Sequence, residues 1–343
     1  MHETGLLKAG EVCLGGEGCL RAAVTGGAGF VGSHLVDRLL AEGFEVRVID
    51  DLSGGCLENL SGAFGREGFS FVKGDIRNLN LVKKLLKGVD VVFHEAAFIS
   101  VALSVKDPLL TNDVNVSGTL NLLKASVDAN VKRFVYASSC AVYGEKSSPI
   151  VTEKDPADPI SPYSVSKLAA ETYVRTFYKV YGLKTTSLRC FNIYGPRQSF
   201  DVGNPYCGVV TIFLNRLQKN MPLTIYDDGK QTRDFAHVKD VVDAYLLAMN
   251  CDSAVGEVFN IGRGKSTSIN ELADTLGNIM HKKVKKEYAD PRPGEIRHSR
   301  ANIDKAKQIL HFNPKVSLKK GLKELVDWHK NARAPPRKAK STK

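Results

Sequence analysis

The 343-residue chain lacks the run of about 20 consecutive apolar residues that a membrane-spanning helix requires. Its first residues also lack the charged, apolar and small-residue order of a secretion signal. Its seven cysteines are odd in number, are scattered along the chain and form no C-x-x-C pair. This usage favours reduced thiols over a disulfide framework or a zinc site, so we predict no metal. We therefore expect a cytoplasmic protein with no membrane partner.

Acidic residues are the scarcer charged class, and the excess of Lys and Arg gives a formal net charge of +11 at pH 7. Five of these cations and no acid lie in residues 331–343, which leaves about +6 on the rest of the chain. A basic tail with two prolines is typical of a solvated, disordered end. No aromatic residues are interleaved with the basic ones to stack bases, so we expect no nucleic-acid partner. Residues 1–19 are Gly-rich without periodicity and are predicted to be an N-terminal extension.

Three glycines spaced three apart, Gly26, Gly29 and Gly32, interrupt the stretch 22–35. Small and β-branched residues precede them and apolar residues follow at helical spacing, which predicts a strand, a tight turn and a helix. The first glycine would allow a sharp bend, the second the close approach of a pyrophosphate, and the third close packing of helix and strand. The free amides of the helix N-terminus would attract the phosphates.

An acidic pair follows the next predicted strand, 44–49, at Asp50 and Asp51. Asp50 lies about 20 residues past the glycine turn, where a carboxylate can accept both hydrogen bonds of an adenosine ribose. The same charge would repel a 2′-phosphate and no arginine follows directly, so NAD is favoured over NADP. The alternative is that these aspartates merely end a strand.

Strands and helices alternate strictly up to residue 190, which predicts an α/β fold with a doubly wound parallel Rossmann sheet. Four small or polar residues fall at strand carboxyl ends, where such sheets bind ligands: Asp75, Ala96, Ala97 and Ser139. Prolines interrupt shorter elements in 191–330, so we predict a dinucleotide-binding domain at 20–190 and a mainly substrate-binding, smaller lobe at 191–330. Further strands of the dinucleotide-binding domain are predicted at 69–72, 89–94 and 133–137, and further helices begin at residue 79 and span 112–129. After residue 190, helices are predicted at 209–219, 240–249, 268–280, 304–310 and 318–330.

Ser161-Pro162 opens a further predicted helix, as a capping residue followed by proline at the first helical position. Tyr163 and Lys167 are four residues apart on it and therefore share one face. A tyrosine normally titrates near ~10, and a neighbouring ammonium would favour its phenolate and make it a base near neutral pH. In the alternative interpretation, Tyr163 is one more aromatic of this helix and Lys167 a solvated charge.

A series of short motifs occurs in order between residues 20 and 330. The motifs are T-G-G-A-G-F-V-G-S-H, D-D-L-S, G-D-I-R, H-E-A-A, S-S-C-A-V-Y-G, S-P-Y-S-V-S-K, L-R-C-F-N-I-Y-G-P-R-Q, Q-T-R-D-F and P-R-P-G-E-I-R-H-S. Together they resemble the extended short-chain dehydrogenase/reductase family and, within it, the UDP-hexose 4-epimerases.

The resemblance implies a catalytic triad of Ser139, Tyr163 and Lys167. Lys167 would bind the nicotinamide ribose and lower the pKa of Tyr163, and Ser139 would hydrogen-bond the sugar 4-hydroxyl. Tyr163 would take the 4-hydroxyl proton as the C4 hydride passes to NAD⁺. The 4-keto sugar would turn over in the pocket and receive the hydride on its other face, so NAD is regenerated in each cycle.

The resemblance also implies two binding sets and a homodimer that packs through helices 112–129 and 163–181. Arg233 and Arg292 would anchor the UDP diphosphate, although Arg233 could form an ordinary surface pair with Asp234 and Arg292 could be a loop charge. His94 and His237 are expected to be structural. The NAD set is Gly26, Gly29, Phe30, Val31, Gly32, Asp50, Asp75, Ile76, Ala96, Ala97, Asn115, Tyr163, Lys167 and Phe191; the UDP-sugar set is Ser139, Asn192, Tyr206, Val209, Tyr226, Arg233, Arg292, Glu295 and Ser299.

Departures from related branches narrow the expected chemistry. The sugar 4,6-dehydratases carry an Asp-Glu pair where this chain has Cys140 and Ala141, and the decarboxylases carry a Glu that is missing here, so elimination is disfavoured. Ser299 occupies the position where a bulky residue can close the epimerase pocket against a 2-acetamido group, so we expect UDP-N-acetylglucosamine to be accepted alongside UDP-glucose. The alternatives are another nucleotide-sugar enzyme of this family (a uronic acid epimerase, dehydratase or decarboxylase) and a non-catalytic nucleotide-binding protein.

Overall fold

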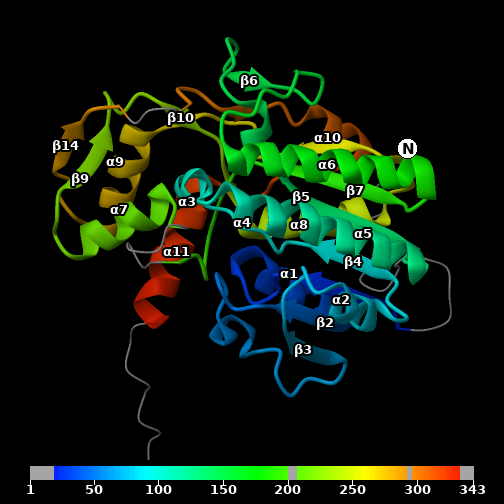
Figure 1. Cartoon of the computed structure of the whole chain (residues 1–343). Helices are drawn as coiled ribbons and strands as arrows, with labels where there is room; N and C mark the ends of the chain where they lie inside the picture. The colour runs from blue at the N-terminus through cyan, green and yellow to red at the C-terminus, as the bar shows by residue number, and fades with distance from the viewer. Residues whose placement is uncertain (1–18, 200–206, 292–295, 333–343) are drawn as a thin grey trace, which may run out of the picture.

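Parallel strands form the central sheet of the computed structural model, which describes residues 19–199, 207–291 and 296–332 (Figure 1). The seven strands run in the order β12-β7-β5-β4-β1-β2-β3, and every neighbouring pair is parallel. Most of their residues are buried, as expected for a parallel sheet covered on both faces. The strands are β1 (Arg21–Thr25), β2 (Glu45–Asp50), β3 (Phe69–Lys73), β4 (Val91–His94), β5 (Arg133–Ser139), β7 (Thr185–Cys190) and β12 (Val258–Ile261).

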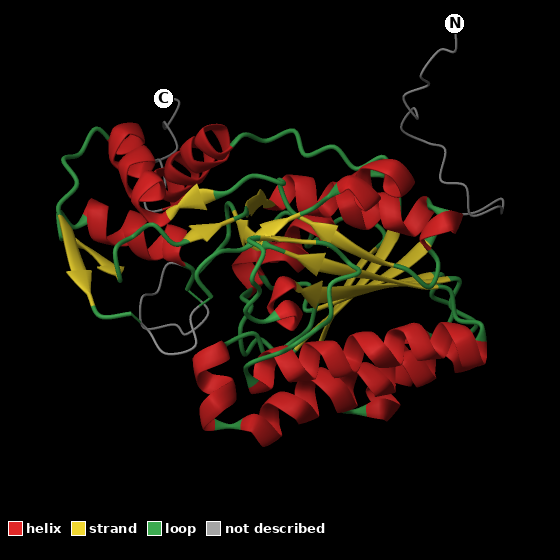
Figure 2. Cartoon of the chain, turned by 90° about the horizontal axis from the view of Figure 1, so that it is seen from above, coloured by secondary structure: helices red, strands yellow, loops and turns green. Residues whose placement is uncertain are grey.

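Helices cover both faces of this sheet, so the sheet lies between two helical layers (Figure 2). Each layer places an apolar stripe on the sheet and closes one hydrophobic core, which is the doubly wound arrangement predicted from the sequence. One layer contains α1 (Phe30–Ala41), α8 (Val238–Asn250) and α10 (Asp304–Leu310), and the other contains α2 (Leu79–Leu86), α5 (Gly118–Asp128) and α6 (Pro162–Tyr181).

The helix predicted at 112–129 is longer and less regular than expected. It begins as α4 (Pro108–Asn112), where the side chain of Asp107 caps the helix and proline occupies its first turn. A π-helical turn, η2 (Asp113–Ser117), then joins α4 to α5. The preceding short helix α3 (Val101–Lys106) was not predicted, because six residues are too few to show helical periodicity.

A smaller lobe has its own apolar core and lies beside the sheet, at the left of Figure 1. All five helices predicted after residue 190 occur within two residues of the expected bounds. However, α8, α10 and β12 belong to the central sheet domain, so the lobe does not include all of 191–330. Its elements are α7 (Val209–Gln218), β9 (Leu223–Tyr226), α9 (Ile269–Met280), β14 (Lys286–Ala289) and α11 (Leu318–Ala332).

Several short elements complete the described structure, and three strand pairs among them join segments that are far apart in the sequence. Helix α11 continues to Ala332, so residues 331 and 332 are helical and the prediction that they belong to a disordered tail is wrong. Within the described ranges, every helix is too short or too polar to cross a bilayer. The short elements are β6 (Ile150–Val151), β8 (Asn192–Tyr194), β10 (Thr232–Arg233), β11 (Phe235–His237), β13 (Thr267–Ser268), β15 (Arg300–Ala301) and the turns η1 (Leu57–Leu60), η3 (Cys140–Tyr143) and η4 (Asp252–Ala254).

Candidate active site

The glycine turn lies between β1 and α1 at the carboxyl edge of the sheet. Gly26 has φ +68°, and a Cβ there would lie 2.7 Å from the backbone nitrogen of Ala96, so both the bend and the close packing require glycine. A Cβ on Gly32 would lie 2.3 Å from the Gly26 carbonyl oxygen, which explains the third glycine by packing, as predicted. Helix α1 starts at Phe30, and no side chain among the described residues caps it. The backbone amides of its first turn, that of Val31 included, therefore remain available at the carboxyl edge of the sheet.

Asp50 supports this turn directly. Its carboxylate accepts hydrogen bonds from the backbone amides of Ala28, at 2.9 Å, and Leu52, at 2.8 Å. The residue is buried, and burial raises the pKa of its carboxyl group. Asp50 therefore does more than end a strand, because it ties the glycine turn to the end of β2. Its contact with a ribose remains a prediction.

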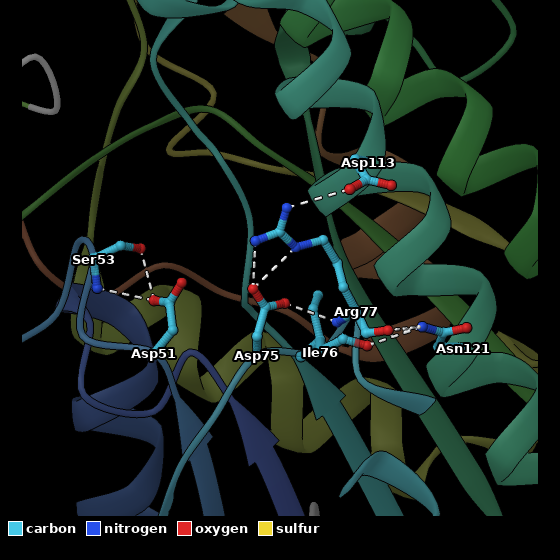
Figure 3. A network of polar contacts seen from close by, with 7 residues as sticks. All are labelled: Asp51, Ser53, Asp75, Ile76, Arg77, Asp113 and Asn121. Atoms are coloured by element: carbon cyan, nitrogen blue, oxygen red, sulfur yellow. Dashed lines mark hydrogen bonds and ion pairs between the residues drawn. The ribbon is translucent and has the colours of Figure 1, made fainter. Parts of the chain in front are cut away.

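A second acidic turn, Asp75-Ile76, is locked in place by a polar network (Figure 3). Arg77 donates to the Asp75 carboxylate from Nε at 2.9 Å and from Nη2 at 2.6 Å, and its Nη1 reaches Asp113 at 3.2 Å. Asn121 donates to the carbonyl oxygens of Ile76, at 3.2 Å, and Arg77, at 2.9 Å. The Arg77 guanidinium holds the pKa of Asp75 below its usual value. The turn is thus fixed against η2 and α5 with a negative charge at the sheet edge.

The three predicted catalytic residues lie together. Ser139 ends β5, and Tyr163 lies in the first turn of α6, where the Ser139 side chain is close enough to influence the pKa of Tyr163. Lys167, one turn further along α6, donates from Nζ to the Ala137 carbonyl oxygen at 2.8 Å. The predicted cap is present, since Ser161 accepts a hydrogen bond from an amide of the first turn. Lys167 is therefore a buried charge, and the solvated alternative is wrong.

The titration of these groups differs from the sequence prediction. Burial raises the pKa of Tyr163 to about 12, although the hydrogen bond with Ser139 opposes this shift. The charge of Lys167 is not among the main influences on the pKa of Tyr163. The prediction that Lys167 lowers the pKa of Tyr163 is therefore wrong. The cause is desolvation, which disfavours the phenolate in this enclosed site. Burial also lowers the pKa of Lys167.

Asp234 organises the side of the site that faces the small lobe. It is fully buried, and its carboxylate accepts hydrogen bonds from three backbone amides at 2.8–3.2 Å. Asn192 donates to its carbonyl oxygen at 3.3 Å. The alternative of a surface pair between Arg233 and Asp234 is therefore wrong. Arg233 instead donates to the carbonyl oxygen of Thr232 at 2.9 Å. The three amides belong to Arg263, Gly264 and Ala301.

The remaining predicted site residues lie in different parts of the structure. The Ser299 side chain is close enough to the Cys140 thiol to oppose the raising of its pKa by burial. Cys140 directly follows Ser139, so Ser299 lies at the catalytic end of the site. Phe191 is buried between β7 and β8. Val209 begins α7 and Tyr226 ends β9 in the lobe. Three predicted residues lie outside the described ranges: Tyr206, Arg292 and Glu295.

Asn115, predicted to contact the cofactor, has its side chain engaged within the protein. Its amide oxygen accepts from the Phe98 backbone amide at 2.7 Å, and its Nδ2 donates to the Phe98 carbonyl oxygen at 3.0 Å and to Ser166 at 2.9 Å. Asn115 thus joins the segment after β4 to helix α6. That segment carries the predicted residues Ala96 and Ala97, and the Ala96 amide donates to Thr25 at 3.1 Å.

The two histidines differ in how well their rings are satisfied. His94 is hydrogen-bonded through both ring nitrogens, to Thr25 and Thr119 at 2.8 Å each, so the structural interpretation is confirmed. His237 is fully buried and accepts from the Lys239 amide at 3.3 Å, whereas its Nε2 has no partner among the described residues. For His237, only one of the two ring nitrogens therefore supports the interpretation as a structural histidine.

Known proteins resemble this chain in sequence and in fold. The model of the NAD dependent epimerase/dehydratase family matches residues 22–262. The chain belongs to this family. The predicted family, the α/β fold class and the NAD cofactor are thereby confirmed.

Three members of the epimerase/dehydratase family illustrate the similarity. A putative UDP-glucose 4-epimerase of Methanocaldococcus jannaschii is 40% identical, covering 90% of this chain and 98% of the relative. The structure of a UDP-N-acetylglucosamine 4-epimerase from Methanobrevibacter ruminantium M1, in complex with UDP-N-acetylmuramic acid, has a TM-score of 0.87 at 36% identity, covering 92% of this chain and 99% of that one. A UDP-glucuronic acid 4-epimerase from Bacillus cereus, in complex with UDP-glucuronic acid and NAD, has a TM-score of 0.85 at 34% identity, covering 91% and 100%.

The carboxyl edge of the sheet fits the NAD of the epimerase/dehydratase family. The uncapped start of α1 suits a pyrophosphate, and the buried carboxylate of Asp50 and the locked carboxylate of Asp75 suit hydroxyl and amino donors. Individual contacts with NAD remain predictions. No group of three His, Cys, Asp or Glu side chains in the described residues could hold a metal ion.

Sequence reasoning missed a buried ion pair behind the catalytic residues. Glu171 and Arg189 pair at 2.5 Å, and Ser138, the neighbour of Ser139, donates to the same carboxylate at 2.5 Å. The Arg189 guanidinium lies 4.7 Å from the ring centre of Tyr143. The network joins α6, β5, β7 and η3 around the site. Glu171 falls four residues after Lys167, and this spacing was the available signal that it shares a face with the catalytic residues.

Proposed function

We propose that the protein catalyses the C4 epimerisation of a UDP-hexose through a transient 4-keto sugar. The observation that carries the proposal is the convergence of three groups at the sheet edge: Ser139 at the end of β5, Tyr163 in the first turn of α6, and the buried Lys167, whose Nζ donates to the Ala137 carbonyl oxygen of β5 at 2.8 Å. Nucleotide-sugar 4-epimerases among the relatives and solved structures support it. NAD, when bound, supplies the acceptor and donor of the C4 hydride.

The protein's own groups then have three tasks. Tyr163 takes the proton of the sugar 4-hydroxyl and returns it. Its hydroxyl is the proton-transferring group at this end of the sheet, and Lys167 lies one turn further along the same helix face. Ser139 donates to or accepts from the same sugar oxygen and keeps Tyr163 oriented. Lys167 holds its ammonium at the end of β5, where it donates to the Ala137 carbonyl oxygen, and it binds the nicotinamide ribose. Arg233, with Arg292, anchors the diphosphate while the sugar ring turns.

The substrate class we propose includes both UDP-glucose and UDP-N-acetylglucosamine. Ser299 lies beside Cys140 at the catalytic end, and its small side chain leaves space for a 2-acetamido group. Cys140 and Ala141 follow Ser139 where an elimination reaction would need carboxylates, so a dehydratase activity is disfavoured. Relatives that act on uronic acids make UDP-glucuronic acid the second candidate.

A panel of UDP-sugars tests the proposal. Purified protein is incubated without added NAD with UDP-galactose, UDP-N-acetylgalactosamine or UDP-glucuronic acid, and the C4 epimer is sought by chromatography. Epimers of the first two and not of the third are expected. Turnover of UDP-glucuronic acid alone would favour the uronic acid epimerase, whereas no epimer from any sugar would favour a non-catalytic binding protein.

We also propose that two copies associate through α6 and the neighbouring α4. Exposed apolar side chains on these helices support this, among them Val165 at 51%, Val180 at 64% and Leu109 at 82% exposure. Light scattering should give the mass of a dimer, and Val165→Asp combined with Leu109→Asp should give a monomer. A monomeric unmodified protein would contradict the proposal.

A further inference from the structure

The turn 195–198, which follows β8, contains a residue in an unusual backbone conformation. Arg197 has φ +68°, in the left-handed region that residues with side chains rarely adopt. Such residues often end helices, as His281 ends α9 and His311 ends α10, but Arg197 ends no helix. Backbone strain of this kind persists where the surrounding structure imposes it, and it is concentrated at functional sites. The proposed reaction gives Arg197 no task.

Two side chains of α1, the helix that follows the glycine turn, hold Arg197. Nε2 of His34 donates to the carbonyl oxygen of Pro196 at 2.9 Å, which fixes the peptide bond that precedes Arg197. The carboxylate of Asp37 accepts a hydrogen bond from Nη2 of Arg197 at 2.6 Å, which fixes its side chain. His34 and Asp37 are three residues apart and are therefore neighbours on one face of the helix. This face of α1 holds both the backbone and the guanidinium of the strained residue.

Helices α8 and α11 restrict the same part of the chain. A Cβ on Gly195 would lie 2.6 Å from Cγ1 of Val238, the first residue of α8. A Cβ on Gly321 of α11 would overlap the hydroxyl of Tyr194, the last residue of β8. That hydroxyl donates to the carbonyl oxygen of Leu318 at 3.3 Å. The turn therefore leaves β8 in a closely packed position beside three helices.

The end of the turn contacts the start of α7. The thiol of Cys207 donates to the carbonyl oxygen of Ser199, the residue after the turn, at 3.4 Å. A Cβ on Gly208 would lie 2.9 Å from the side-chain nitrogen of Gln198. Gly208 directly precedes Val209, the first residue of α7. The position of the turn therefore affects where α7 begins.

We propose that Asp37 is a positioning residue for the UDP part of the substrate and that it acts through Arg197. Their ion pair fixes the turn between two residues that we expect at the substrate, Asn192 on β8 and Val209 on α7. Since the glycine turn leads into α1, this helix would position the nucleotide of the substrate as well as the cofactor. The assignment to UDP rests on the proposed epimerase activity, whereas the contacts that hold the turn do not.

The test is Asp37→Asn, which keeps the shape of the side chain and removes its charge. The Kd of the holoenzyme for UDP, measured by calorimetry, and the KM for UDP-galactose should both rise about threefold, a factor in keeping with the strength of a partly exposed ion pair. The exposed fractions are 22% for the Arg197 side chain and 37% for that of Asp37, so the variant should still fold. kcat and the NAD content should be unchanged, because the catalytic groups lie on β5 and α6.

Variants of Arg197 separate positioning from a general loss of stability. Arg197→Asn removes the guanidinium but tolerates the left-handed conformation, so it should raise both constants by the same factor as Asp37→Asn. The two changes together should have no larger effect than either alone, because each removes the same interaction. Exchange of the charges, Asp37→Arg with Arg197→Asp, should restore part of the affinity.

Asp243→Asn is the matched control. It removes an ion pair at 2.8 Å between Asp243 of α8 and Arg38, the residue after Asp37, and the exposed fraction of the Asp243 side chain is 33%. This ion pair lies outside the turn, so UDP affinity and KM should not change. If Asp243→Asn weakened UDP binding as much as Asp37→Asn, the effect would not be specific to the turn and the proposal would be wrong.

UDP binding also distinguishes this proposal from the epimerase activity. An unchanged Kd for UDP in folded Asp37→Asn and Arg197→Asn would overturn the positioning role, whichever sugars the enzyme turns over. A weakened affinity in a protein that epimerises no UDP-sugar would support the positioning role and reject the epimerase. Failure of the unmodified holoenzyme to bind UDP would contradict both proposals.

Discussion

Lys167 on helix α6 donates from Nζ to the carbonyl oxygen of Ala137 on strand β5 at 2.8 Å. Ser139 ends the same strand, and Tyr163 lies one turn before Lys167, in the first turn of α6. One strand and one helix thus position the three predicted catalytic groups.

Tyr163→Phe should lower kcat for epimerisation by about 10²–10⁴-fold, because the ring remains and only the proton-transferring hydroxyl is lost. The NAD content of the purified protein, measured by chromatography after denaturation, should be unchanged. Tyr173→Phe removes a hydroxyl from an exposed tyrosine of the same helix and should have no effect on either quantity. Equal activity of the two variants would remove Tyr163 from the chemistry.

The order of strands and helices was predictable because it depends on local patterns. Apolar periodicity, the three glycines and the Ser161 cap each act within a few residues, and all are found where the sequence indicates. The π-helical turn at Asp113 was not predictable, because its periodicity differs little from that of the flanking helix.

Much of the site depends instead on contacts between distant segments. Asp234 meets the backbone amides of Arg263 and Ala301, so its role could not be read from neighbouring residues. The pKa of Tyr163 was predicted in the wrong direction for the same reason. Spacing showed that Lys167 shares its helix face, but not how strongly the surrounding side chains desolvate the phenol.

Ser299→Tyr should lower the ratio of turnover on UDP-N-acetylglucosamine to turnover on UDP-glucose. The larger side chain would fill the space beside Cys140 that we assign to the acetamido group. A loss of about tenfold in the ratio is expected, since steric exclusion of a few atoms is worth roughly 1–3 kcal/mol. Ser299→Ala keeps the side chain small and should leave the ratio unaltered. If the tyrosine variant keeps the ratio of the unmodified enzyme, Ser299 does not select the sugar.

Mild acid should destabilise the protein through His94. Burial lowers the pKa of His94 from 6.5 to about 3, so between these values the unfolded chain binds more protons than the folded one. The contribution of His94 to stability is therefore complete above pH 6.5 and is lost as the pH falls towards 3. At pH 5 the loss is about 2 kcal/mol.

Urea unfolding at pH 7.5 and pH 5.0 measures this effect, and His94→Gln should show a smaller loss of stability between the two pH values than the unmodified protein. His281→Asn alters an exposed histidine with φ +53°, a conformation that asparagine tolerates, and should behave as the unmodified protein does. Equal pH dependence in all three proteins would show that another group is responsible.

Glu171→Gln should destabilise the fold by about 3–5 kcal/mol, because it leaves the guanidinium of Arg189 buried without its counter-ion. Only 8% of the Arg189 side chain is exposed, so water cannot replace the lost charge. Glutamine preserves the size of the side chain and its contact with Ser138, so the loss measures the charge and not a cavity.

Glu42→Gln is the matched control, since Glu42 pairs with Arg38 at 2.5 Å on the surface of α1, where 45% of the arginine side chain is exposed. Water solvates both partners there, so the expected loss is below about 1 kcal/mol. Urea unfolding of both variants compares the two ion pairs at equal separation. Similar losses in the free energy of unfolding would mean that solvent reaches Arg189 in solution. The charges of Glu171 and Arg189 would then not hold α6 to the sheet.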